Sequence, residues 1–332
     1  MSSEALLEVR NLTTRFHTRQ GTVHAVNGVS FSLARGEVLS LVGESGCGKS
    51  ATVLSLLRLL PSRQATSTAE AIRYDGQDLL SLDEEAMRRV RGAEIGMVFQ
   101  DPLTSLNPVL TIGRQMTEML EVHRGLSSAQ ARDKATKLLL AVGIPRPEDR
   151  LDDYPHQFSG GMCQRVMIAM ALSCDPGLLI ADEPTTALDV TIQAQILEMV
   201  AELRASRDMA MIWITHDLRV VADLADWVAV MYGGYIVEYA RVGPLFASPQ
   251  HPYTRGLLAS IPQIDGDRQE RLSTVPGQPP SMTTLPRGCP FAERCELVLD
   301  KCREENPPLM ELEDDRRVAC WWDIEAGRER RV

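Results

Sequence analysis

Apolar and polar positions along the first sixty residues predict strands followed by a helix. The segment Leu6–Phe16 alternates and is rich in β-forming residues, which predicts an opening strand. Two more strands are predicted on either side of the turn Ala34–Gly36, the second being Val38–Val42. That strand leads into a glycine-rich loop and then the apolar stretch Ala51–Leu60, so we expect a strand–loop–helix unit here.

The middle of the chain has a mainly helical pattern of apolar and polar positions. Residues 101–164 carry helical patterns, such as Ser128–Val142, broken by proline-containing loops. Leu178–Pro184 and Met209–Asp217 then return to short buried-strand character, each followed by a helical pattern. Strands that alternate with helices predict an α/β fold with a mainly parallel sheet, into which a helical subdomain is inserted.

A proline-rich tail follows, and we expect it to form a separate small domain. Its prolines crowd a segment of weak periodicity, which predicts loops held by something other than a core: Pro276, Pro279, Pro280, Pro286 and Pro290. We place the boundary near Ser260, which divides the chain into domains 1–260 and 261–332. A length of 332 residues fits one large domain with an appendage.

Composition narrows the class of protein. The chain has 35 Lys and Arg against 45 Asp and Glu, a net charge of −10, which argues against nucleic acid as a partner. No apolar run approaches the roughly 18 residues that cross a bilayer, and the N-terminus lacks the apolar core of a secretory signal. We therefore expect a cytoplasmic protein whose membrane contact comes through other subunits.

The strongest chemical motif is a phosphate loop. Its glycines let backbone N–H groups cradle phosphates at a helix N-terminus, its lysine reaches the β- and γ-phosphates, and its hydroxyl binds Mg²⁺. The alternative is a glycine-rich turn with a solvated lysine, which the flanking strand and helix disfavour. The candidate nucleotide-binding residues are Gly43, Glu44, Ser45, Gly46, Cys47, Gly48, Lys49, Ser50 and Ala51, with Ser50 also a Mg²⁺ ligand.

Two carboxylates end a second buried-type strand. Asp182 is placed to join the shell of Mg²⁺, directly or through water. Glu183 points to the other side, where a general base could polarise a water facing the γ-phosphate. An ordinary acidic turn is the alternative.

Three further positions carry weaker signals. His216 ends another strand and could contact the γ-phosphate or the attacking water, although a lone histidine is often structural. Gln100 also ends a strand and could sense metal or water. Ser159 can cap a helix beginning near Gly160, which with Gly161 would leave N–H groups open to an anion.

Together these segments resemble the ABC ATPases. The resemblance implies a P-loop NTPase core of the RecA-like type, a β-rich N-terminal subdomain, a helical subdomain at about 101–164, and a small Pro- and Cys-rich C-terminal domain. It also implies ATP and Mg²⁺ as cofactors, shared between two ATPase subunits. The implied roles are a Q-loop residue at Gln100, a signature at Ser159, Gly160 and Gly161, acidic residues at Asp182 and Glu183, a D-loop at Asp189, and a switch histidine at His216.

Two positions qualify that resemblance. Phe16 lies where the family stacks an aromatic ring on adenine, and a core aromatic on the first strand is nearly as well supported. Met162 replaces the glutamine usual in the signature, which could make the two ATP sites unequal.

Several segments are similar to the dipeptide and oligopeptide importer ATPases, some of whose relatives move nickel or glutathione: Phe99–Pro108, Thr185–Thr191 and His251–Thr254. The resemblance implies a second homologous ATPase, two transmembrane permease subunits, an external substrate-binding protein, and a peripheral location on the cytoplasmic face of the inner membrane. A soluble ABC ATPase acting on DNA or ribosomes is the rival. It is disfavoured because long coiled-coil insertions or fused ATPase units are missing from the sequence.

Four of the seven cysteines cluster in the tail: Cys289, Cys295, Cys302 and Cys320. Because a reducing cytosol disfavours disulfides, such a cluster first indicates a metal site. The spacings exceed the gaps usual in zinc sites, and the importer resemblance implies a structural [4Fe–4S] cluster, with zinc or free thiols as alternatives. We expect the cluster to replace a missing core and to leave ATP binding at Lys49 almost unaffected. At Cys47, we expect the loop N–H groups to lower the thiol pKa.

Overall fold

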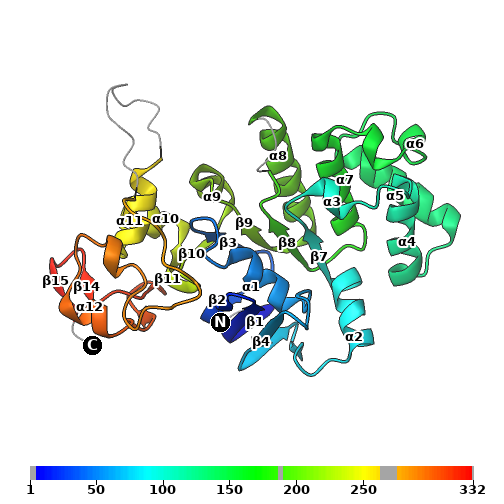
Figure 1. The fold of residues 1–332 in the computed structure, drawn as a ribbon. Coiled ribbons are helices and arrows are strands. Elements are labelled where there is room, and N and C mark those ends of the chain that lie inside the picture. The colour runs from blue at the N-terminus through cyan, green and yellow to red at the C-terminus, as the bar shows by residue number, and fades with distance from the viewer. Residues whose placement is uncertain (1–4, 186–189, 262–274, 331–332) are drawn as a thin grey trace. The chain divides into compact units, whose positions relative to one another are not determined.

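The computed structural model describes residues 5–185, 190–261 and 275–330 (Figure 1). The chain forms two compact units, each described by itself below. The first unit contains residues 5–6, 33–38 and 78–214, and the second contains 7–32, 39–77 and the described residues from 215 onward. Within the described ranges, the helices are too short or too polar to cross a membrane.

The first unit is built on three parallel strands. They are β7 (Ile95–Val98), β8 (Leu178–Asp182) and β9 (Ala210–Ile214), with β8 between the other two. Every residue of β8 and β9 is buried, as expected of strands with both faces covered. The predicted parallel pairing is confirmed here, and it brings the carboxyl ends of these strands to one edge.

Helices connect these strands. Between β7 and β8 the described residues are helical or irregular, as the sequence predicts for 101–164. The helix at Ser128 starts where predicted because Ser127 and Gln130 form a reciprocal capping box. The helical segments of the unit are α2 (Glu84–Arg89), η1 (Val90–Glu94), α3 (Pro102–Ser105), α4 (Ile112–Arg124), α5 (Ser128–Ala141), α6 (Pro147–Arg150), η2 (Pro155–Gln157), α7 (Gly160–Leu172) and α8 (Val190–Arg207).

The second unit begins with an antiparallel sheet. The predicted opening strand is confirmed as β1 (Leu7–Thr18), which pairs antiparallel with β4 (Ala65–Thr68) and β5 (Ala71–Tyr74). Strand β2 (Gly21–Leu33) and the short β6 (Gln77–Asp78) complete the sheet in the order β2-β1-β5-β6.

A second group of strands carries the phosphate loop. Strand β3 (Val38–Val42) lies parallel to β10 (Trp227–Tyr232), and β11 (Tyr235–Arg241) is antiparallel to β10. The helix after the loop ends at Leu56, short of the predicted Leu60. The helices of this unit up to the tail are α1 (Lys49–Leu56), α9 (Leu218–Leu224), α10 (Val242–Ala247) and α11 (Pro252–Ala259).

The tail packs into the core of the second unit, so the expectation that it lacks a core is wrong. Phe291 and Trp321 are 4% and 5% exposed and belong to one apolar cluster with Tyr232 and Tyr253. Phe291 makes ring contacts with both tyrosines, at centroid distances of 5.2 and 5.4 Å. The tail elements are η3 (Ala292–Arg294), α12 (Asp300–Glu304), β12 (Met310–Glu311), β13 (Arg317–Val318), β14 (Trp322–Asp323) and β15 (Arg328–Glu329).

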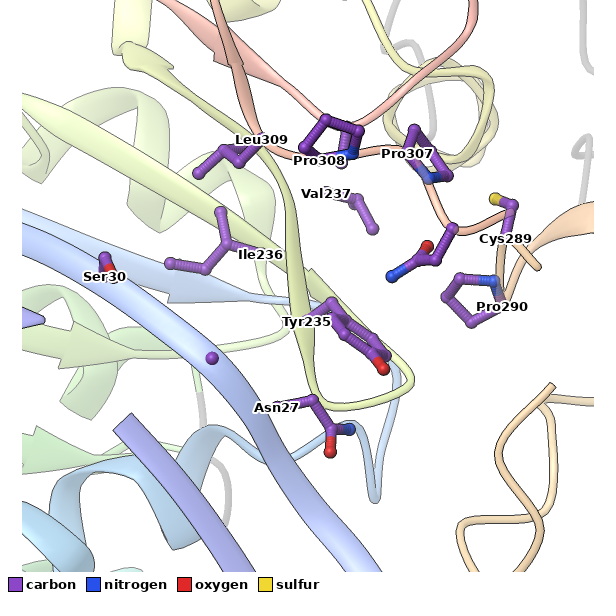
Figure 2. Close-up of a pocket in the computed structure, with 13 residues that line it drawn as sticks. Asn27, Ser30, Tyr235, Ile236, Val237, Cys289, Pro290, Pro307, Pro308 and Leu309 are labelled. Atoms are coloured by element: carbon purple, nitrogen blue, oxygen red, sulfur yellow. The ribbon is translucent and has the colours of Figure 1, made fainter. Parts of the chain in front are cut away.

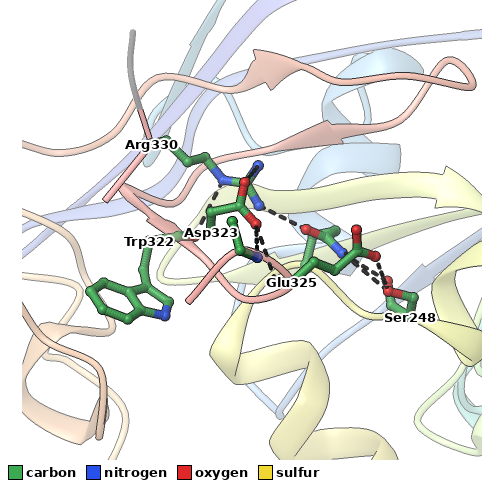
Figure 3. A network of polar contacts seen from close by, with 7 residues as sticks. Ser248, Trp322, Asp323, Glu325 and Arg330 are labelled. Atoms are coloured by element: carbon green, nitrogen blue, oxygen red, sulfur yellow. Dashed lines mark hydrogen bonds and ion pairs between the residues drawn. The ribbon is translucent and has the colours of Figure 1, made fainter. Parts of the chain in front are cut away.

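A polar network ties the last hairpin to the segment before α11 (Figure 3). Arg330 donates to the side-chain oxygen of Gln250 at 2.8 Å and pairs with Asp323 at 3.4 Å. Gln250 in turn donates to Glu325 at 2.8 Å, and the hydroxyl of Ser248 donates to the same carboxylate. The hairpin β14–β15 is therefore fixed to the body of the second unit.

Candidate functional site

The phosphate loop of the second unit has a backbone that only glycine fits at two positions. Gly43 has a φ of +148°, and a Cβ there would lie 2.2 Å from the carbonyl oxygen of Met231. Gly48 has a φ of +106°, and a Cβ there would lie 2.2 Å from the carbonyl oxygen of Ala25. The glycines thus let the loop curl tightly at the start of α1, which is the cradle that phosphates need.

Lys49 points into this cradle. Its side chain is 5% exposed, and its Nζ donates to the carbonyl oxygens of Gly43 at 2.8 Å and Glu44 at 3.1 Å. A nearly buried ammonium at a glycine-rich helix N-terminus attracts a multiply charged anion. The residues present therefore fit a nucleoside triphosphate. Ser50 and Ala51 follow in the first turn of α1, while Ser45 and Gly46 are exposed at the loop tip.

The expectation for Cys47 is wrong. Burial raises the pKa of its thiol, and the opposing effect of Lys49 and the backbone N–H groups is smaller. The side chain is only 6% exposed. Cys47 is therefore a packed thiol within the loop and lacks the reactivity of an exposed thiolate.

Two residues that the sequence reasoning did not assign to the site also touch this loop. The phenolic oxygen of Tyr253 accepts a hydrogen bond from the backbone N–H of Glu44 at 2.9 Å. Arg294 pairs with the carboxylate of Glu44 at 2.7 Å. The sequence marks His251–Thr254 only as a segment shared with the peptide-importer ATPases, and its pattern does not distinguish Arg294.

In the first unit, the two predicted acidic residues lie at the carboxyl end of β8. Asp182 is the last residue of β8 and is 5% exposed, whereas Glu183 is half-buried. The amide Nε2 of Gln100, which follows β7, donates to Oε2 of Glu183 at 3.3 Å. Glu183 has a φ of 47°, a left-handed conformation that is uncommon outside glycine and often found at functional sites.

The helix start at Ser159 is open to its surroundings. The hydroxyl of Ser159 accepts a hydrogen bond from the N–H of Met162 at 3.3 Å, so the predicted cap of α7 is confirmed. Ser159 and Gly160 are exposed, Gly161 is partly exposed, and a Cβ at Gly160 would meet no atom within 4 Å. This helix N-terminus can therefore receive a group from another molecule.

The remaining predicted residues are placed as follows. His216 is exposed two residues after β9 ends, at the start of the segment that returns to the second unit. Phe16 is half-buried on β1 opposite Ala65, so both readings of this aromatic stay open. Asp189 lies outside the described residues.

Comparison with known proteins identifies the family. The ABC transporter family model matches residues 26–186, and the model for the oligopeptide/dipeptide transporter C-terminal region matches residues 237–302. A probable peptide ABC transporter ATP-binding protein of Sinorhizobium fredii is 51% identical over 319 residues, covering 96% of this chain and 95% of that protein. This chain belongs to the ABC transporter ATP-binding family. The oligopeptide transport ATP-binding protein OppD of Bacillus subtilis is 50% identical over 316 residues, covering 95% of this chain and 88% of the relative.

Solved ABC structures confirm the predicted P-loop α/β fold. A dimeric ATP-binding cassette bound to ADP and Pi matches with a TM-score of 0.64 and 26% identity, covering 71% of this chain and 98% of that one. The protein cbiO1 of Clostridium perfringens, part of an ABC transporter complex, matches with a TM-score of 0.62 and 28% identity, covering 74% and 92%. ATP and Mg²⁺ are the cofactors of this ATPase family, as the sequence predicts.

The tail cysteines of this ABC protein lie near one another. Burial first, and then the neighbouring thiols, raise the pKa of Cys289 and of Cys320 to about 12. Burial and the charge of Cys302 also raise the pKa of Cys295. Within the described ranges, however, no group of three or more His, Cys, Asp or Glu residues is arranged to hold a metal ion. The structure therefore gives no support to the expected [4Fe–4S] cluster.

Cys289 also borders a pocket of about 220 Å³ in the second unit (Figure 2). One wall is formed by Asn27 and Ser30 of β2, and another by Tyr235–Val237 of β11. The tail closes it with prolines, including Pro290 and Pro307. A pocket thus remains between the tail, β2 and β11, although the N–H of Ala319 in the tail donates to the carbonyl oxygen of Val237 in β11 at 2.8 Å.

Proposed function

We propose that this chain is the ATP-hydrolysing subunit of an importer that takes up dipeptides or oligopeptides across the cytoplasmic membrane. The observation that carries the proposal is the match of residues 237–302 to the oligopeptide/dipeptide transporter C-terminal region, joined to an intact phosphate loop. The names of relatives that cover nearly the whole chain support the peptide substrate. Nickel and glutathione remain the alternative cargoes.

The roles of the site residues follow from their chemistry. The phosphate loop with Lys49 binds the nucleotide phosphates, and Ser50, Gln100 and Asp182 are the proposed residues around Mg²⁺. Mg²⁺, when bound, neutralises charge on the phosphates. Glu183 accepts a proton from the attacking water, with Gln100 holding its carboxylate, and His216 contacts the γ-phosphate. Ser159, Gly160, Gly161 and Asp189 serve a nucleotide bound by a partner ATPase.

The proposed partners are a second homologous ATPase, two permease subunits and an external binding protein. Exposed apolar side chains at the two ends of segment 100–108 support a protein contact there: Phe99 is 39% exposed and Val109 is 76% exposed. We propose that permease helices dock on residues 100–108 and on the helical subdomain. Docking on the permease subunits would hold the chain on the cytoplasmic side of the membrane as a peripheral subunit. We also keep the proposed division of the chain into domains 1–260 and 261–332.

The test is purification from membranes followed by an uptake assay. Tagged chain should co-purify with two polytopic subunits, and vesicles containing that complex should take up labelled dipeptide or tripeptide when supplied with Mg-ATP. The variant Lys49→Ala should assemble equally well and abolish uptake, because it removes the ammonium from the loop. Recovery of the chain with DNA or ribosomes in place of membrane subunits would overturn the proposal.

We also propose that the four tail cysteines hold a [4Fe–4S] cluster when iron is supplied. The backbone N–H of Cys289 donates to the carbonyl oxygen of Cys302 at 2.7 Å, so these two residues lie together, and four thiolates are the donor set such a cluster needs. Anaerobically purified chain should contain about four irons and absorb broadly near 400 nm. Cys302→Ser should remove both signals, whereas Cys174→Ser, outside the tail, should leave them unchanged. A colourless protein with one zinc per chain would decide for zinc.

A further inference from the structure

A buried arginine of the tail reaches the phosphate loop. Nη1 of Arg294 lies 2.7 Å from Oε2 of Glu44, and Nη2 lies 2.9 Å from Oε1 of the same carboxylate. The side chain of Arg294 is 5% exposed and that of Glu44 is 26% exposed. Two parallel hydrogen bonds are the strongest arrangement for this pair, and burial protects it from screening by salt.

The guanidinium of Arg294 is fixed on its other sides. It donates to the hydroxyl of Tyr232 at 3.1 Å and to the carbonyl oxygens of Val275 at 3.0 Å and Pro276 at 2.6 Å. It also lies over the rings of Tyr232 and Phe291, 5.7 and 5.9 Å from the centroids. The bond to Glu44 raises the pKa of Arg294 more than burial lowers it. The cation therefore has one defined position.

Two backbone contacts reach the same loop from neighbouring elements. The N–H of Glu44 donates to the phenolic oxygen of Tyr253 at 2.9 Å, and the N–H of Gly234 donates to the carbonyl oxygen of Cys47 at 3.1 Å. Gly233 faces the tail, since a Cβ there would lie 3.0 Å from Cβ of Pro290. The loop is thus held at three points, by Arg294 of the tail and by two elements that pack with the tail.

The negative charge of Glu44 makes its ion pair with Arg294 relevant to phosphate binding. A carboxylate in the phosphate loop repels phosphates unless a cation balances it. Arg294 supplies that cation. The carbonyl oxygen of Glu44 also accepts a hydrogen bond from Lys49 Nζ at 3.1 Å, so movement of Glu44 displaces a contact of the phosphate-binding lysine.

We infer that Arg294 is a positioning residue for the phosphate loop, through which the cysteine-bearing tail sets the affinity for nucleotide phosphates. Arg294 is the last residue of η3 and immediately precedes Cys295, so it lies within the cysteine-bearing part of the tail. This inference differs from the expectation that changes at the tail cysteines leave ATP binding at Lys49 almost unaffected. The inference rests on the proposed binding of ATP at this loop.

A double-substitution cycle on the full-length chain tests the inference, with Mg-ATP binding measured by displacement of a fluorescent ATP analogue. Arg294→Met should raise the dissociation constant roughly tenfold, because Glu44 is then uncompensated. Adding Glu44→Gln to that variant should recover most of the affinity, since the repelling charge is gone. A purely structural role of Arg294 predicts no such recovery.

Matched variants separate the possible outcomes. Arg303→Met removes an equal charge from the tail and should leave the affinity unchanged, because Arg303 is 53% exposed and its ion pair among the described residues is with the exposed Glu293. If Arg294→Met fails to fold, as judged by limited proteolysis, Arg294→Lys keeps the charge and should weaken binding by a smaller factor.

Unchanged affinity in a folded Arg294→Met chain, or no recovery on adding Glu44→Gln, overturns the inference. If the inference fails in this way but Lys49→Ala still loses ATP binding, the proposed function stands without the role of Arg294. Failure of the unsubstituted chain to bind Mg-ATP overturns the proposed function instead.

Discussion

Glu183→Gln should lower the ATPase rate of the assembled complex by at least about 100-fold while leaving Mg-ATP binding intact. The amide is neutral and cannot take a proton from the attacking water. The substitution should also hold the two ATPase subunits together, because the closed dimer opens after hydrolysis. Steady-state phosphate release and gel filtration with ATP measure the two effects.

The substitution preserves the size and shape of the side chain and removes its charge and its ability to accept a proton. Gln100 donates from Nε2 to Oε2 of Glu183 at 3.3 Å, and the side-chain carbonyl of a glutamine can accept the same bond. The backbone N–H of residue 183 donates to the carbonyl oxygen of Ile214 at 3.0 Å and is unaltered. Glu85→Gln, at a side chain 84% exposed on α2, is the matched control and should retain normal turnover. Normal turnover in Glu183→Gln itself would falsify the assignment of the base.

Local sequence was sufficient to predict the phosphate loop and the strands that lead to the site. The φ values of +148° at Gly43 and +106° at Gly48 are open to glycine alone, so the motif determines the loop conformation within eight residues. The buried runs β8 and β9 are short, wholly apolar apart from Asp182, and bounded by turns, which identifies strands without tertiary information.

The sequence pattern could not predict contacts between residues that are far apart in the chain. Tyr253 and Arg294 meet Glu44 across 209 and 250 positions, and no spacing rule connects residues so far apart. Cys47 was misjudged for a related reason. The N–H groups that lower a thiol pKa are visible in the motif, whereas the burial that outweighs them comes from the surrounding fold.

The tail illustrates how composition can mislead. Its prolines and weak periodicity suggested a segment without a core, yet Phe291 and Trp321 are almost fully buried among residues of β10 and α11. A few large aromatic side chains bury as much apolar surface as a longer periodic segment, and periodicity does not register them. The tail therefore folds as part of the unit that carries the phosphate loop.

Ser159→Asp should reduce the ATPase rate of the full complex on the order of 100-fold, while the isolated chain binds Mg-ATP normally. Ser159 lies at the exposed start of α7, in the first unit, and a Cβ at the neighbouring Gly160 would meet no atom within 4 Å. If this helix start faces a nucleotide bound by the partner ATPase, a carboxylate there repels the γ-phosphate across the subunit boundary.

The matched control is Ser159→Asn. Both asparagine and aspartate retain a side-chain oxygen that can replace the Ser159 hydroxyl as acceptor for the N–H of Met162, so neither loses the helix cap. The two variants have nearly the same shape and differ in charge, so the excess loss in Ser159→Asp measures repulsion alone. Equal activity of the two variants would show that no nucleotide phosphate lies near Ser159. Loss of ATP binding by the isolated Ser159→Asp chain would place the nucleotide beside its own Ser159, contrary to a site completed by the partner.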